Sequence, residues 1–217
     1  TDVDSITIDT GDGDDIVVVA SINDPITSLN GGSGTDTLQG ADAANTWSLG
    51  ATTTYAGAGA LVTFTNFATL QGGTGADTFN VTAASSFNLK GGAGVDTFDI
   101  DAALTGSVDG EAGADVLQGV LIDAVVLTGS DADGFAGTEA SVSGGFDGIQ
   151  VLTGNGGALT GQNVASTWGL DGTPTYSNGT HTLNFSGFAT LQGGSNADAF
   201  NVTAASSFNL KGGAGVD

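Results

Sequence analysis

The sequence predicts an all-β fold, a right-handed parallel β-solenoid of about 19–21 residues per rung and about eleven rungs. The chain repeats itself after 121 residues, and an apolar residue recurs about every 20 residues before a glycine-rich turn. Composition agrees, because 38 Gly, many Thr and Asp, and aromatics that are mostly Phe suit short strands joined by tight turns.

The long repeat divides the chain into units. The segment at 80–96 is identical to that at 201–217. Nine residues that mark the repeat recur 121 positions later, the last three of them within that segment, namely Trp47, Tyr55, Phe64, Phe67, Leu70, Phe79, Phe87, Leu89 and Lys90. We expect residues 1–217 to form a single continuous solenoid, with a first unit at 36–156 and a partial second unit at 157–217.

The short repeat predicts one stacked ladder of apolar residues. Its members are separated by 18 to 25 residues and are Ile8, Leu29, Leu49, Leu70, Leu89, Val108, Leu127, Leu152, Leu170, Leu191 and Leu210. A rung of this length is too short for a strand, a helix and two loops, but it holds two or three short strands. At about 4.8 Å between stacked strands, eleven rungs give a rod on the order of 50 Å long.

Most rungs carry the turn L-x-G-G-x-G-x-D, followed by alternating apolar residues such as Phe79-x-Val81. Two stretches replace it with a threonine-rich segment, TWSLGATTTY at 46–55 and TWGLDGTPTY at 167–176, for which we expect a turn of another shape. The longest spacing falls near 129–154, where we expect a bulged loop.

The charge of the chain limits its partners. Twenty-four acidic residues against two lysines and no arginine give a net charge of −22, so nucleic acid and anionic membranes are disfavoured. No apolar run of about 18 residues occurs, so we expect no membrane insertion in this segment. Cations and hydrogen-bonding surfaces remain as partners. Alternatively, the acidity only keeps a β-rich rod soluble.

The turn resembles the calcium-binding nonapeptide of RTX proteins, which implies Ca²⁺ as a candidate ligand. Carboxylates stacked about 5 Å apart repel each other by about 1 kcal/mol unless they are solvated or bridged by a cation. The candidate metal ligands are Asp77, Asp96 and Asp115 as the longest row, with Asp15 beside Asp36 and Asp198 beside Asp217. RTX repeats place such a turn at both edges, whereas each rung here has one, so we expect a single row at one edge. The alternative is that each Asp caps its own turn.

Other polar and aromatic residues fit structural roles. We expect Lys90 to pair with Asp109 on the neighbouring rung rather than act as a catalytic amine, and the lone His181 to lie on the surface. Trp47, Trp168, Tyr55 and Tyr176 are expected to fill the core; an aromatic platform for sugars is the alternative.

The pattern TWSL…FTNFATLQGGTGADTF at 46–79, repeated as TWGL…FSGFATLQGGSNADAF at 167–200, resembles the repeat regions of giant bacterial surface and biofilm-matrix adhesins of the filamentous-haemagglutinin type. The resemblance implies an extracellular stalk on a bacterial surface or in a biofilm matrix. Its partners would be matrix polysaccharide or other copies of the chain. No catalytic or cofactor-binding residue is implied.

Three functions are therefore open. The first is a structural stalk segment of an adhesin in cell–cell or matrix attachment and biofilm formation. The second is a calcium-dependent module that binds carbohydrate or another surface. A β-helix enzyme acting on polysaccharide is disfavoured, because the chain has no arginine and near-identical repeats do not build a unique active site.

Overall fold

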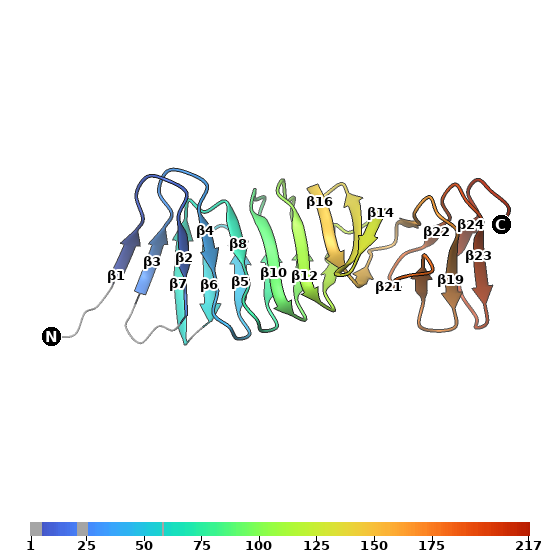
Figure 1. Ribbon diagram of the computed structural model, residues 1–217, viewed down its shortest axis with the longest axis horizontal. Helices are drawn as coiled ribbons and strands as arrows, with labels where there is room; N and C mark the ends of the chain where they lie inside the picture. Colours follow the sequence, from blue (N-terminus) through green and yellow to red (C-terminus); the bar gives the residue numbers. More distant parts are fainter. Residues whose placement is uncertain (1–5, 21–25, 58) are drawn as a thin grey trace.

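The computed structural model describes residues 6–20, 26–57 and 59–217. All regular secondary structure in this part of the chain is β-strand, which confirms the all-β prediction. Figure 1 shows an elongated molecule in which the strands cross the long axis and the first and last described strands lie at opposite ends.

Two long sheets, in which most pairs are parallel, contain these strands. The 13-stranded sheet pairs, in order, β1 (Ile6–Asp9), β3 (Ile26–Asn30), β7 (Ala60–Thr65), β6 (Thr53–Gly57), β5 (Thr46–Leu49), β9 (Thr78–Val81), β11 (Thr97–Ile100), β13 (Val116–Gln118), β17 (Val151–Thr153), β21 (Thr182–Ser186), β20 (Thr175–Ser177), β19 (Ser166–Leu170) and β23 (Asp198–Val202). The 11-stranded sheet pairs β2 (Ile16–Val18), β4 (Thr37–Gln39), β8 (Thr69–Gln71), β10 (Asn88–Gly94), β12 (Val108–Gly113), β16 (Val142–Ile149), β15 (Gly134–Glu139), β14 (Ala124–Asp131), β18 (Ala158–Thr160), β22 (Thr190–Gln192) and β24 (Asn209–Lys211).

The chain passes alternately through the two sheets, and one strand of each sheet in succession is called a rung here. Parallel pairing places equivalent residues of successive rungs side by side, as in the pair Phe79 and Phe98. The expected single apolar ladder is wrong, because its members divide between the sheets: Leu152 lies in the 13-stranded sheet and Leu89 in the 11-stranded sheet. The period is the same in both sheets, so spacing alone does not separate them.

Three antiparallel insertions interrupt the parallel order. In the first, β5 pairs with β9 and β7 pairs with β3, while β6 runs between β5 and β7 in the opposite direction. Strands β19, β20 and β21 repeat this arrangement, and β14, β15 and β16 form another insertion in the 11-stranded sheet. Each threonine-rich segment thus forms a β-hairpin, with one strand on either side of the turn. The expected bulged loop near 129–154 is likewise wrong, since it is occupied by paired strands.

The core consists of the inward side chains of both sheets. Trp47 stacks on Phe79 with ring centroids 5.7 Å apart, and Phe79 stacks on Phe98 at 5.1 Å. Trp168 stacks on Phe200 in the same way at 5.5 Å. Both tryptophans are fully buried, so they fill the core as expected and do not form a sugar platform.

Close stacking explains the second glycine of the turn motif. Gly32, Gly92 and Gly213 have φ of +82°, +102° and +100°, in the left-handed region. A Cβ on Gly92 would overlap the carbonyl oxygen of Gly73 on the preceding rung, and Gly32 and Gly213 meet their neighbours in the same way. Conformation and contact both require glycine here.

We predict that Gly92→Ala destabilises the fold more than Gly179→Ala. Gly179 also has a positive φ, +90°, but a Cβ there meets nothing within 4 Å, so the substitution costs only the backbone strain of about 1–3 kcal/mol. Gly92→Ala adds an overlap with backbone that cannot rotate away. The unfolding free energy of both variants, measured by denaturant titration, tests this difference. Equal losses would show that rung spacing does not constrain the turn.

Candidate functional site: the buried aspartates and the acidic strip

The motif aspartates lie in two different kinds of turn. Asp15 and Asp36 come just before strands of the 11-stranded sheet, β2 and β4. Asp77, Asp96, Asp115 and Asp198 stand just before or at the start of β9, β11, β13 and β23 in the 13-stranded sheet, and Asp217 follows β24. The chain alternates between the sheets, so these two sets occupy opposite turns. The expectation of one row at one edge is therefore wrong.

Within each set, the carboxylates connect neighbouring rungs through the backbone. The amide of Asp77 donates to Oδ1 of Asp96 at 2.7 Å, and the amide of Asp96 donates to Oδ1 of Asp115 at 2.8 Å. The same bond joins Asp15 to Asp36 at 2.9 Å and Asp198 to Asp217 at 3.0 Å. Each carboxylate thus satisfies a backbone donor that stacking would otherwise leave unpaired.

A cap within the residue's own turn, the alternative expectation, is formed by Asp77. Its Oδ2 accepts a hydrogen bond from the amide of Gly73 at 2.9 Å. By contrast, Oδ2 of Asp15, Asp36, Asp96, Asp115 and Asp198 is buried without a hydrogen-bond partner. Connection between rungs is therefore the shared role of these residues.

Neutral residues, which the sequence reading missed, flank the acidic rows. Asn45 donates to Oδ1 of Asp77 through its backbone amide at 2.9 Å and its side chain at 2.6 Å. At the other end, the amide of Asp115 donates to Oε1 of Gln150, and Ser166 donates its hydroxyl to Asp198. Asn45 and Ser166 are 121 residues apart, each two residues before a tryptophan, which is the signal that could have identified them.

Burial raises the pKa of the central carboxyl groups. Desolvation is the main cause for Asp96, whose pKa rises to about 6, and for Asp115, whose pKa rises to about 7. Amide hydrogen bonds oppose this rise, whereas neighbouring carboxylates add to it. Desolvation likewise raises the pKa of Asp77. These groups are consequently costly to keep ionised at neutral pH.

The first glycine of the motif makes room for this carboxyl group. A Cβ on Gly91 would overlap Oδ2 of Asp96, and Gly72 stands in the same relation to Asp77. Together with the requirement at the second glycine, stacking and the buried Asp account for the first two glycines of the GGxGxD pattern.

The turns offer few of the ligands that calcium needs. Calcium takes about six to eight oxygen ligands. Oδ1 of Asp96 and of Asp115 already accepts an amide hydrogen bond, and the turn carbonyl of Gly73 accepts one from Ala93. Within residues 6–20, 26–57 and 59–217, no group of three or more His, Cys, Asp or Glu is placed to hold a metal. A calcium site of the RTX kind at these turns therefore stays a prediction.

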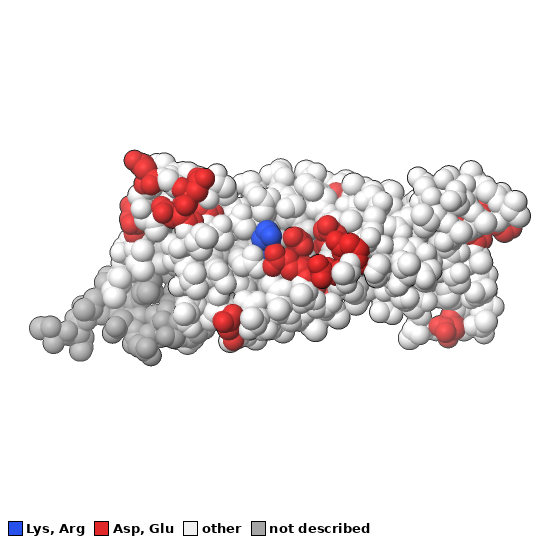
Figure 2. All heavy atoms as spheres, viewed as in Figure 1, with Lys and Arg blue, Asp and Glu red and all other residues white. Residues whose placement is uncertain are grey.

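An acidic strip, comprising Asp109, Glu111, Asp131, Asp133 and Asp147, lies beside Lys90 on the outside of the 11-stranded sheet. Figure 2 shows acidic side chains gathered next to a single basic one on this face. Lys90 Nζ is 3.7 Å from Asp109 Oδ2, which confirms the expected pair, and 2.8 Å from Glu111 Oε1.

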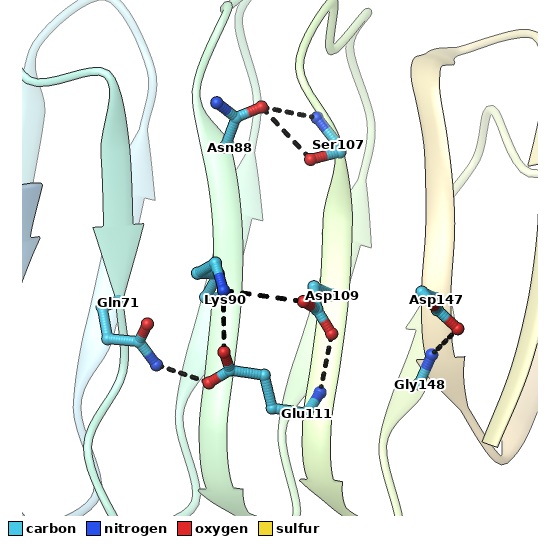
Figure 3. Close-up of polar contacts among 8 residues, drawn as sticks. All are labelled: Gln71, Asn88, Lys90, Ser107, Asp109, Glu111, Asp147 and Gly148. Carbon is cyan, nitrogen blue, oxygen red and sulfur yellow. Dashed lines mark hydrogen bonds and ion pairs between the residues drawn. The ribbon is translucent and has the colours of Figure 1, made fainter. Parts of the chain in front are cut away.

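Glu111 is the better partner of Lys90, and the sequence reading missed it. Figure 3 shows its carboxylate bound by Lys90 and also by Gln71 Nε2, at 2.7 Å, so that three neighbouring strands are joined. Burial opposes ionisation of Glu111, but these donors hold its pKa below the ordinary value. Its φ is +58°, at the position that holds glycine in the other turns. The two polar contacts of the Glu111 side chain thus offset the strain of this backbone conformation.

His181 lies at the surface, where its side chain is half-buried. Its Nδ1 lies 3.2 Å from Ser130 Oγ, and its ring meets Phe135 edge-on at 6.4 Å between centroids. The β14–β15–β16 insertion supplies both neighbours, which is why the sequence spacing did not reveal them. These contacts give His181 a packing role.

Comparison with protein-family models and with curated proteins finds no match for this chain. Within the described residues there is no helix whose length and apolar character would allow it to cross a membrane. A function for this chain is therefore inferred from its own residues.

The raised carboxyl pKa values predict that the fold gains stability as pH falls from about 8 to 5. The folded state binds protons to Asp96 and Asp115 near pH 6 and 7, whereas the unfolded chain binds them only near 3.8. Folding therefore takes up protons across this window, and the gain is complete below about pH 4. Thermal melts across this pH range measure the effect.

Matched variants assign this pH dependence to the row. Asp115→Asn, with an amide oxygen still available as an acceptor, should raise stability at pH 8 and reduce the slope. Asp42→Asn, at an exposed aspartate, should leave the slope unchanged. A steep slope retained in both variants would contradict the assignment.

Proposed function

We propose that this chain is a segment of a right-handed parallel β-solenoid of about eleven rungs that acts as a structural stalk in a secreted or cell-surface bacterial adhesin. It would serve cell–cell or matrix attachment and biofilm formation, with matrix polysaccharide or other copies of the chain as partners. The role requires no catalytic residue and places the chain outside the cell, on the bacterial surface or in the biofilm matrix.

One observation carries the proposal, namely that both sheets run the length of an elongated molecule with backbone pairing renewed from rung to rung. Stacked aromatic rings and aspartate bonds add further connections between some neighbouring rungs. Structures of this kind are stabilised by nearest-neighbour contacts and extend by adding units. A rod assembled in this way holds its two ends a fixed distance apart, which is the task of a spacer.

The stalk proposal predicts that length grows in equal steps with the number of units. Inserting one or two further copies of residues 36–156 should increase the maximum dimension by the same increment each time, because each copy adds the same set of strands. Small-angle X-ray scattering of the three proteins, with the mass of each particle measured in parallel, tests this. A compact particle, or a dimension that does not grow with each copy, would contradict the stalk.

A calcium-dependent binding module is the second candidate, and the unpartnered Oδ2 atoms favour it. Those of Asp96 and Asp115 lie buried on successive rungs, where a cation would offset their desolvation. The remaining ligands would have to be water or oxygens from outside the described residues.

Calcium binding at the row predicts a higher melting temperature in millimolar Ca²⁺ than in chelator at pH 8. The difference should disappear in the double variant Asp96→Asn and Asp115→Asn, and persist in the exposed control Asp42→Asn. Magnesium at the same ionic strength separates specific binding from screening. A melting temperature that is the same in chelator as in Ca²⁺ would rule out calcium binding at the row and leave the stalk proposal unaffected.

A further inference from the structure

The outward face of the 13-stranded sheet carries a continuous row of hydrogen-bonding side chains. Consecutive paired positions hold Thr7, Ser28, Thr63, Thr54, Ser48, Asn80, Asp99 and Gln118. All are at least partly exposed, and each has at least one neighbour in its own strand that is buried or half-buried. Eight strands at about 4.8 Å spacing make a row on the order of 34 Å long.

The row depends on the first antiparallel insertion. Ser48 pairs with Thr54 and Thr54 pairs with Thr63, so the row crosses β5, β6 and β7 without a gap. These residues are scattered in the sequence, and only the strand order aligns them. The polar row is therefore defined by its place on the sheet and not by a motif.

At its end the row enters a groove of about 390 Å³, lined by Asp99, Asp101, Gln118, Val120, Thr153 and Asn155. Asp101 Oδ1 accepts the amide hydrogen of Val120 at 2.9 Å, and Asn155 Nδ2 donates to the Val120 carbonyl at 2.8 Å. The backbone at Val120 is thus held from both sides, and its side chain is 58% exposed. The groove combines hydrogen-bond donors and acceptors with one apolar contact.

The chemistry of the row selects among ligands. Its hydroxyl and amide groups can both donate and accept, and its one charged member, Asp99, is an acceptor when ionised. The only two basic residues of the chain lie on β10 and β24 of the other sheet. An anionic polymer would meet no Lys or Arg on this face, whereas the hydroxyls of a neutral polyhydroxylated chain could both donate to and accept from these side chains.

We propose that the polar row and its groove bind a neutral polysaccharide lying along the long axis of the molecule. The inference rests on the proposed function only in taking polysaccharide as the partner; the stalk can hold without it. Single contacts of this kind are weak in water, but equally spaced contacts add along a chain. Affinity should accordingly grow with the length of the ligand.

Isothermal titration with neutral glucan, mannan and galactan oligosaccharides of increasing length tests the proposal, with oligogalacturonates as anionic counterparts. At least one neutral series should bind more tightly as it lengthens. The double variant Asn80→Ala and Gln118→Ala should weaken binding roughly tenfold, since two hydrogen-bonding side chains are lost. The matched control, Thr37→Ala with Gln39→Ala, changes outward residues of the 11-stranded sheet and should bind as the parent does.

Circular dichroism and melting temperatures should be unchanged in both variants, because all four residues lie outside the core. Three results would overturn the inference: no binding of any neutral series, binding that is equally tight for oligogalacturonates, or equal weakening in the control. An elongated scattering particle together with any of these results would reject the saccharide row and keep the stalk.

Discussion

The close approach of backbone to backbone between successive rungs is the constraint on which the rest of the structure depends. It brings Gly73 against Gly92 so tightly that no side chain fits, and it stacks Phe79 on Phe98 in the core. It also sets the aspartates one strand spacing apart. The turn motif, the aromatic core and the acidic rows are consequently three results of one repeated distance, and the near identity of the repeats follows from it.

The buried aspartates satisfy backbone amides that the stacked turns would otherwise leave unpaired. A turn that passes from sheet to sheet leaves backbone amides facing the neighbouring rung, and the carboxylate of Asp96 or Asp115 satisfies one of them. The cost is desolvation of an acid, which the raised pKa values report. Asn45 and Gln150 flank the longest row with neutral groups, so the like charges are limited to three adjacent rungs. The stability of the fold therefore depends on the protonation of the buried turn aspartates. The charges of the acidic strip near Lys90 are instead exposed and screened by solvent.

Sequence periodicity predicted the all-β fold, the buried tryptophans and the pairing of Lys90 with Asp109, because each depends on residues that recur at fixed spacing. It did not predict that the ladder residues divide between two sheets, since the period is the same in both. It also could not reveal the antiparallel insertions, in which β6 reverses direction between β5 and β7. The polar row ending at Gln118 was hidden for the same reason: its order follows the strand order and not the chain. Glu111 was overlooked because it replaces a glycine whose role became clear only from its φ.

The antiparallel insertions make the two faces of the molecule unequal. Two of them lie in one sheet and one in the other, which is why the strand counts are 13 and 11. The excess of two strands makes the 13-stranded sheet about 10 Å longer along the long axis than the other sheet. A two-layered strip with one longer layer must curve or slant its connections, and insertions on alternate faces turn it first one way and then back. Because the insertions alternate between the sheets along the chain, the longer layer changes from one sheet to the other and back along the molecule.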